Sequence, residues 1–188
     1  LSAYGSDIPI ACTGIISKVN QVFMAICIGI SQGSQPILGF NYGAEKYSRV
    51  RQTYRYSVTL CTVIATIFFI CFQFFPHQIV GIFGNGSDLY FHFAEKYLRI
   101  FMLMTFANGI QPMSACFFTS IGKARLGVIM SLTRQVLFLL PLIVIFPVFF
   151  GIDGVMYAGP IADTSAFVLA VVFARRELGV MKTAEQNA

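Results

Sequence analysis

The chain has 188 residues, of which 56% are hydrophobic and only 11% are charged, and its mean hydropathy is +0.73. Ordinary globular domains carry about 25% charged residues, so this composition argues against a soluble protein, including a soluble all-α protein with unusually buried helices. The net charge of +5 does not predict a nucleic-acid partner, because the basic residues stand in short clusters between apolar runs, as in membrane loops. Five cysteines are scattered singly, without metal-ligand spacing, which predicts neither a metal site nor a disulfide framework.

Hydropathy predicts an all-α membrane protein, a polytopic bundle with five transmembrane helices that contacts membrane lipid. About 20 helical residues cross a hydrocarbon core of about 30 Å. The predicted spans cover residues 9–40, 56–75, 90–119, 126–150 and 154–174, and residues 175–188 follow them as a tail. Between the second and third spans, residues 79–83 are compatible with a short interfacial helix and equally with a plain loop.

Basic residues are strongly biased to alternate connections. The loop after the first span, the loop after the third span and the C-terminal tail hold nine of the 13 Lys and Arg residues: Lys46, Arg49, Arg51, Arg55, Lys123, Arg125, Arg175, Arg176 and Lys182. Cytoplasmic loops carry such an excess. We therefore expect a multi-pass protein of the cell membrane with its N-terminus outside and its C-terminus in the cytoplasm.

Three charged residues lie inside predicted spans. By the helical rise, Lys18, Arg134 and Asp163 each fall about 12–14 Å from one end of their span, close to the midplane. A charge at this depth is costly and marks a functional site by default. Because the fourth and fifth spans are joined by a short link, we expect Arg134 to pair with Asp163, and Lys18 is the other candidate partner. Such a pair has either a role in transport or gating, or a purely structural role in helix packing.

Uncharged polar residues also recur inside the spans, where they can line a cavity or satisfy free carbonyls. The candidates are Asn20, Gln21, Asn108, Gln111 and Gln135. Two of the spans carry a Gln-Pro pair, at Gln35-Pro36 and at Gln111-Pro112. Since proline removes a backbone donor, these pairs predict kinks at matching depth, as in the discontinuous helices that line transporter cavities.

The sequence contains no pattern expected of an enzyme. HExxH, GxSxG and P-loop motifs are absent, and no nucleophile stands with a base at one depth. His77 and His92 both lie at the outer boundary of the predicted membrane region. We therefore expect no catalytic activity and no cofactor.

Three stretches carry a family resemblance. GISQGSQPILGFNYGAEK at 29–46, SLTRQVLFLLPLIVIFP at 131–147 and GVMYAGPIADTSAF at 154–167 resemble, in order and spacing, helices of the multidrug and toxic compound extrusion (MATE) family. The resemblance implies two lobes of six helices, with this chain as a C-terminal lobe that lacks most of its first helix and whose partner is the missing N-terminal lobe. It also implies an antiporter that exports small organic, often cationic, compounds in exchange for Na+ or H+. The alternative is a related two-lobed flippase for lipid-linked or polyisoprenoid cargo.

The first of these stretches has a physical interpretation. Small residues permit close helix approach, and prolines bend helices. The positions to which we assign kinks or packing, here and in the later spans, are Gly33, Gln35, Pro36, Gly39, Gly43, Pro112 and Pro160. Some members of the family carry a coupling-ion carboxylate in the span that matches residues 90–119. Here that span has only Glu95, near its outer end, so we expect the coupling acid in the missing lobe.

Overall fold

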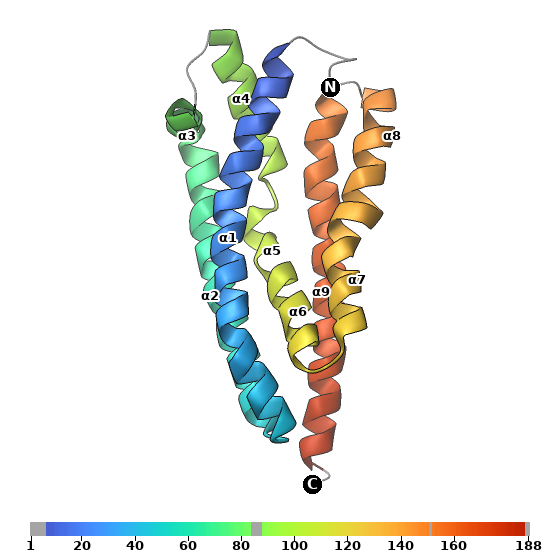
Figure 1. The fold of residues 1–188 in the computed structure, drawn as a ribbon. Coiled ribbons are helices and arrows are strands. Elements are labelled where there is room, and N and C mark those ends of the chain that lie inside the picture. The colour runs from blue at the N-terminus through green and yellow to red at the C-terminus, as the bar shows by residue number, and fades with distance from the viewer. Residues whose placement is uncertain (1–6, 84–87, 151, 187–188) are drawn as a thin grey trace.

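The computed structural model describes residues 7–83, 88–150 and 152–186, and its elements are helices, most of which run along a common bundle axis (Figure 1). In chain order they are α1 (Asp7–Gly43), α2 (Tyr47–Phe74), α3 (Pro76–Phe83), α4 (Asp88–Phe101), α5 (Thr105–Asn108), α6 (Ile110–Ser120), α7 (Ala124–Leu132), the π-helix η1 (Thr133–Leu139), α8 (Leu140–Phe150) and α9 (Ile152–Gln186). No strand occurs in these ranges. The all-α prediction is confirmed.

The five predicted spans correspond to helices of membrane-crossing length. Within the described ranges, four continuous helical segments are long and apolar enough to cross a bilayer, and the bent pair Tyr90–Phe101 and Thr105–Ser120 makes a fifth if the two helices count as one span. Two ends differ clearly from the prediction. The second helix begins at Tyr47 and not at residue 56. The segment expected as a tail at 175–188 continues α9 through Gln186, because no proline or strained glycine interrupts it.

The short segment after the second span is a helix and not a plain loop, and its interfacial position stays a prediction. α3 follows α2 with only Phe75 between them. In Figure 1 its axis lies across the axis of the bundle. Ile82 is exposed while Val80 is fully buried, so the helix has one face toward the bundle and one away from it, as an interfacial helix does.

The third span is broken, and the break lies earlier than the Gln-Pro pair predicted. α4 and the segment α5–α6 meet at residues 102–104 with a bend of 47°. Pro112 instead occupies the first turn of α6, where a missing N–H leaves no intrahelical bond unmade. Pro36 and Pro160 both lie inside single helices, α1 and α9. The break thus lies away from both Gln-Pro pairs, and the kinks predicted at those pairs stay predictions.

Two apolar clusters fill the bundle, and a polar layer separates them. One cluster joins the first half of α1 to α2, α3 and α4, and it ends at Met102. The other joins the end of α1 to α2, α6, α7 and α9, and it begins on α6 at Met113. The buried polar residues Thr105, Asn108 and Gln111 fall between these two positions. The break in the third span thus coincides with the polar layer.

Small residues allow the helices of this bundle to approach closely. On α9 a buried alanine recurs at every fourth position: Ala158, Ala162, Ala166, Ala170 and Ala174. A Cβ on Gly39 would lie 3.3 Å from the Ser120 carbonyl oxygen, so α1 approaches the end of α6 there. A Cβ built on Gly33 or on Gly43 would have no neighbouring atom within 4 Å. The expectation that these two glycines pack against a neighbouring helix is not met among the described residues.

Candidate functional site

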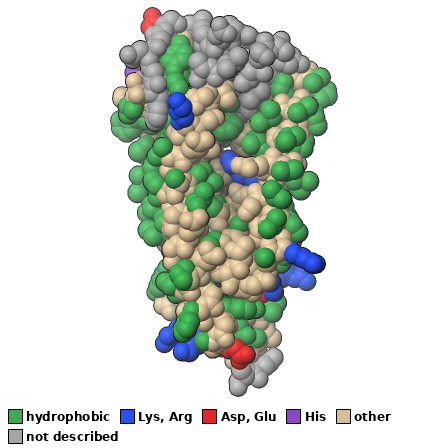
Figure 2. All heavy atoms as spheres, viewed as in Figure 1, with side chains coloured by type: hydrophobic (Ala, Val, Ile, Leu, Met, Phe, Trp, Pro, Cys, Tyr) green, Lys and Arg blue, Asp and Glu red, His purple; other side chains and the backbone are tan. Residues whose placement is uncertain are grey.

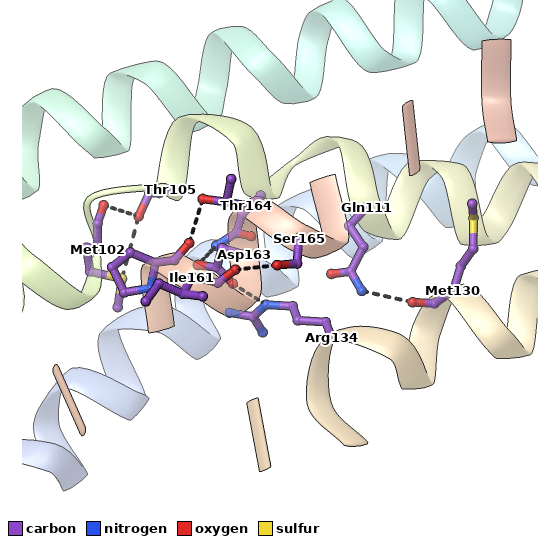
Figure 3. A network of polar contacts seen from close by, with 11 residues as sticks. Met102, Thr105, Gln111, Met130, Arg134, Ile161, Asp163, Thr164 and Ser165 are labelled. Carbon is purple, nitrogen blue, oxygen red and sulfur yellow. Dashed lines mark hydrogen bonds and ion pairs between the residues drawn. The ribbon is translucent and has the colours of Figure 1, made fainter. Parts of the chain in front are cut away.

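The two buried charges of the fourth and fifth spans form an ion pair. Arg134 Nε donates to Asp163 Oδ1 at 2.5 Å, and the two side chains are 8% and 2% exposed. The other carboxylate oxygen, Oδ2, accepts a hydrogen bond of 2.6 Å from Asn108 Nδ2. Asp163 on α9 therefore joins η1 to α5, and the pairing expected from the sequence is present (Figure 3).

A widened helical turn positions Arg134. The π-helix η1 begins one residue before it, at Thr133, and π-turns are frequent at functional sites. Pro141 follows shortly after η1 and has no N–H for the Leu137 carbonyl, which gives a physical reason for a change of helical pitch here. Gln111 Nε2 donates to the Met130 carbonyl at 3.0 Å, where α7 gives way to the wider turn.

Hydrogen bonds to carbonyls also support the break in the third span. Thr105 Oγ1 donates to the Met102 carbonyl at 2.8 Å, just beyond the end of α4 (Figure 3). Three side chains on successive turns thereby donate to buried acceptors. Thr105 donates to the Met102 carbonyl, Asn108 to the Asp163 carboxylate and Gln111 to the Met130 carbonyl. Polar side chains are needed wherever a helix is interrupted at membrane depth.

The other predicted polar residues are not part of this network. Lys18 is exposed on α1, and within the described ranges it forms no ion pair, so the alternative Lys18–Asp163 pair is wrong. Asn20 is half-buried and Gln21 is exposed, and neither lines the cavity described below. Gln135 is also exposed, on η1.

A cavity of about 410 Å³ lies between α1, α6 and the α7–η1 segment. Its polar lining comes mainly from glutamines on three elements, Gln32 and Gln35 on α1, Gln111 on α6 and Gln135 on η1, together with Arg134. Met24 and Ile28 supply apolar wall. Figure 2 shows basic side-chain atoms within a hollow at mid-height of the molecule. Drug-sized ligands occupy cavities of about 300–1,000 Å³ with this mixture of apolar wall and few polar groups.

Sequence reasoning misses part of this lining. Gln32 stands out in the sequence only through its place near a proline, and nothing marks Ser131 or Thr119, although all three line the cavity. A helical-periodicity test finds the α1 stripe, because Met24, Ile28, Ser31 and Gln35 recur at intervals of three and four residues. The π-turn has only the weak sequence signal of Pro141.

The basic loops gather at one end of the bundle. The α1–α2 turn, the α6–α7 turn and the last turns of α9 lie at the same end (Figure 1), and Figure 2 shows Lys and Arg side chains concentrated there. Two ion pairs join these segments: Lys123 Nζ lies 2.6 Å from Glu177 Oε1, and Arg51 pairs with Glu185.

Comparison with known proteins gives a consistent result. The family model described as MatE matches residues 1–152. Multidrug export protein MepA of Staphylococcus saprophyticus is 26% identical over 172 residues, which are 92% of this chain and 37% of that protein. MepA of Staphylococcus aureus strain MSSA476 is 25% identical over 187 residues, 98% of this chain and 41% of that protein. The chain thus spans about two-fifths of the length of these curated relatives.

Solved structures share the fold. The MATE multidrug transporter DinF-BH, solved as a complex, matches with a TM-score of 0.82 and 34% identity over 90% of this chain and 38% of its own. An outward-facing MATE family transporter of the MOP superfamily matches with a TM-score of 0.87 over 96% of this chain and 41% of its own. The identity there is 16%, so that likeness concerns the fold alone.

Proposed function

Because the chain belongs to the MatE family, we propose that it is the C-terminal lobe of a two-lobed, multi-pass transporter that exports organic compounds in exchange for Na+ or H+. The similar curated proteins are multidrug export proteins, and this chain aligns with 37–41% of their length. The remaining length is enough for a second lobe of similar size. The missing N-terminal lobe is therefore the first partner that we propose.

The observation that carries this proposal is the cavity at the level of the broken helix. Secondary transporters bind cargo near the midplane, beside discontinuous helices. Here the cavity shares Gln111 and Arg134 with the polar layer at the break. Gln32 and Gln35 are exposed on α1, where their amides can donate to or accept from cargo. Met24 and Ile28 provide apolar contact for aromatic or aliphatic parts of the same compound.

The ion pair has a positioning role in this scheme. Asp163 holds η1 through Arg134 and α5 through Asn108, so any rearrangement of the broken span must move or break these bonds. Alternating access requires helices to shift around a fixed site. We assign to Asp163 the coupling of α5 to η1 during that shift.

The coupling ion needs an acid that the cavity of this lobe does not supply. The described residues that line the cavity include no Asp or Glu. Glu95 lies in the middle of α4, in the outer part of the broken span, and its Oε1 is 2.7 Å from His77 Nδ1. We therefore place the carboxylate that binds Na+ or H+ in the N-terminal lobe.

Transport by the complete protein tests the proposal. The whole transporter that contains this chain is expressed in cells that lack their major drug exporters, and accumulation of a fluorescent dye is followed. We expect lower accumulation than in empty-vector cells, with loss of the difference when the Na+ and H+ gradients are both collapsed. Everted vesicles given one gradient at a time identify the ion. Dye accumulation equal to that of the empty vector in cells that contain the folded protein contradicts the proposal.

A further inference from the structure

The guanidinium group of Arg134 has more hydrogen-bond donors than the protein uses. Arginine carries five N–H donors in a planar fork, and here Nε bonds to Asp163 Oδ1. The two terminal nitrogens bond to no other described residue (Figure 3). Within the described ranges, no fully buried side-chain nitrogen or oxygen lacks a partner. The terminal nitrogens therefore reach the open space of the cavity that Arg134 lines.

Asp163 has no comparable spare capacity. Each of its carboxylate oxygens already accepts a hydrogen bond, one from Arg134 and one from Asn108, and its side chain is 2% exposed. It does not line the cavity. A ligand in the cavity thus meets the donors of the ion pair and not its acceptors.

The rest of the cavity does not offset this positive character. The other polar groups that line it are neutral, chiefly the amides of Gln32, Gln35 and Gln135, and no acidic side chain stands among the described lining residues. A neutral amide can both donate and accept hydrogen bonds, so it binds anionic and cationic groups alike. The preference of the cavity for one sign of charge therefore depends on Arg134. A guanidinium fork matches a planar or tetrahedral oxyanion with two parallel hydrogen bonds.

We propose that this cavity binds an oxyanion carried by the cargo, a carboxylate, sulfonate or phosphate, with the terminal nitrogens of Arg134 as the charged anchor and the glutamine amides around it. The proposal rests on the transport function above and gives it a substrate class: acidic or zwitterionic organic compounds. A compound that is only cationic gains no ionic partner in this lobe. Its charge must be matched elsewhere in the transporter.

Two dyes that differ by one group test the preference. Rhodamine 19 has a free carboxylate, and rhodamine 6G is its ethyl ester, so the ester has an ethyl group in place of the negative charge. Binding to the full-length transporter in nanodiscs is measured by fluorescence polarisation. We expect rhodamine 19 to bind at least about tenfold more tightly than the ester, as a charge-assisted hydrogen bond provides.

Three variants locate the anchor. Gln135→Glu adds a carboxylate to the cavity wall at an exposed position, so the protein keeps its fold, and we expect the acid-to-ester preference to fall about tenfold. The double change Arg134→Gln with Asp163→Asn removes both charges, so neither is left buried alone. We expect the ratio of acid to ester affinity to fall to about one. Gln78→Glu, exposed on α3 outside the cavity, makes the same charge change and should alter neither affinity.

The outcomes separate this proposal from the transport function. Equal affinities for the two dyes in the unmodified protein overturn the oxyanion site and leave the transport function standing. A preference that survives Gln135→Glu and the double change also overturns it, because the carboxylate then binds elsewhere. Failure to bind or export either dye overturns both proposals.

A last arm distinguishes a soluble oxyanion from a lipid phosphate. Polyprenyl phosphate is added to the nanodiscs at increasing mole fraction while rhodamine 19 is bound. If polyprenyl phosphate displaces rhodamine 19, and does so less well in the Gln135→Glu variant, the site binds a lipid phosphate. If rhodamine 19 stays bound, the site binds soluble acids. Both results support an oxyanion site at Arg134.

Discussion

Asp163 accepts hydrogen bonds from two different elements, and this determines the cost of removing either charge. Arg134→Leu leaves Asp163 buried with Asn108 as its remaining donor, and Asp163→Leu leaves Arg134 buried beside an apolar side chain. Breaking a buried pair by removing one partner costs about 3–5 kcal/mol. We expect each single change to lower the thermal unfolding temperature of the full-length transporter, and the double change to recover part of the loss.

The measurement is the coupling free energy between Arg134 and Asp163, obtained from the stabilities of the two single variants and the double variant. Gln73→Leu serves as a matched control, because its Nε2 donates only to the Arg99 carbonyl near the end of α4. Losses from the two single changes that simply add would show that the two charges do not stabilise one another.

The sequence predicts well how deep each charged residue of this site lies along its helix. Arg134 and Asp163 could be paired in advance because the rise per residue and a short link between spans fix their relative heights. Depth alone does not give the direction of a side chain. Lys18 was expected at a similar depth, yet it lies on the exposed face of α1. The bond from Asn108 depends on a break in the third span that local sequence does not specify.

At the level of the helices, contact between α6 and α7 depends on the absence of one side chain. A Cβ on Gly127 would lie 2.5 Å from Thr119 Cγ2 and 2.9 Å from the Ala115 carbonyl oxygen. The threonine can rotate, but the backbone oxygen cannot move without separating the helices. We expect Gly127→Ala to destabilise the protein by about 1–3 kcal/mol, as overpacking does, measured by thermal unfolding in detergent.

Gly179→Ala is the matched control for this prediction. Gly179 lies in α9 with nothing within 4 Å of a built Cβ, so the change should raise stability slightly, by about 0.5–1 kcal/mol, because alanine favours the helix. Equal effects at both positions would mean that helix propensity and not helix contact governs Gly127.

The helices illustrate why spans are easier to predict than breaks. Apolar length predicted the candidate crossings, since a bilayer demands about 20 apolar residues. Proline position did not set the break in the third span. Pro36 lies inside a continuous α1, and the 47° bend lies at 102–104, near no proline. Tertiary partners, such as the bond from Thr105 to Met102, stabilise the break and are invisible in a local pattern.

For the molecule as a whole, the charged end predicts orientation in the membrane. Ser48→Cys and Ala124→Cys place exposed thiols in the two basic turns, and Gln78→Cys places one on α3 near the opposite end. Basic loops stay in the cytoplasm. We expect an impermeant maleimide to label only position 78 in intact cells, and positions 48 and 124 after permeabilisation. Labelling of 48 and 124 from outside contradicts a cytoplasmic C-terminus.

One lobe should not be enough for transport. Substrate paths in secondary transporters lie at the interface between repeats, and residues 1–188 align with only 37–41% of the curated exporters. The exposed side chains of Gln32, Gln35 and Gln135 line only one wall of such a path. We expect residues 1–188, purified alone and reconstituted in liposomes, to show no gradient-driven dye uptake above protein-free liposomes. The complete transporter, reconstituted at the same protein-to-lipid ratio, should concentrate the dye until the gradient is collapsed. Gradient-driven uptake by the single lobe would mean that its own cavity opens to both sides, and the two-lobed mechanism would then have to be abandoned.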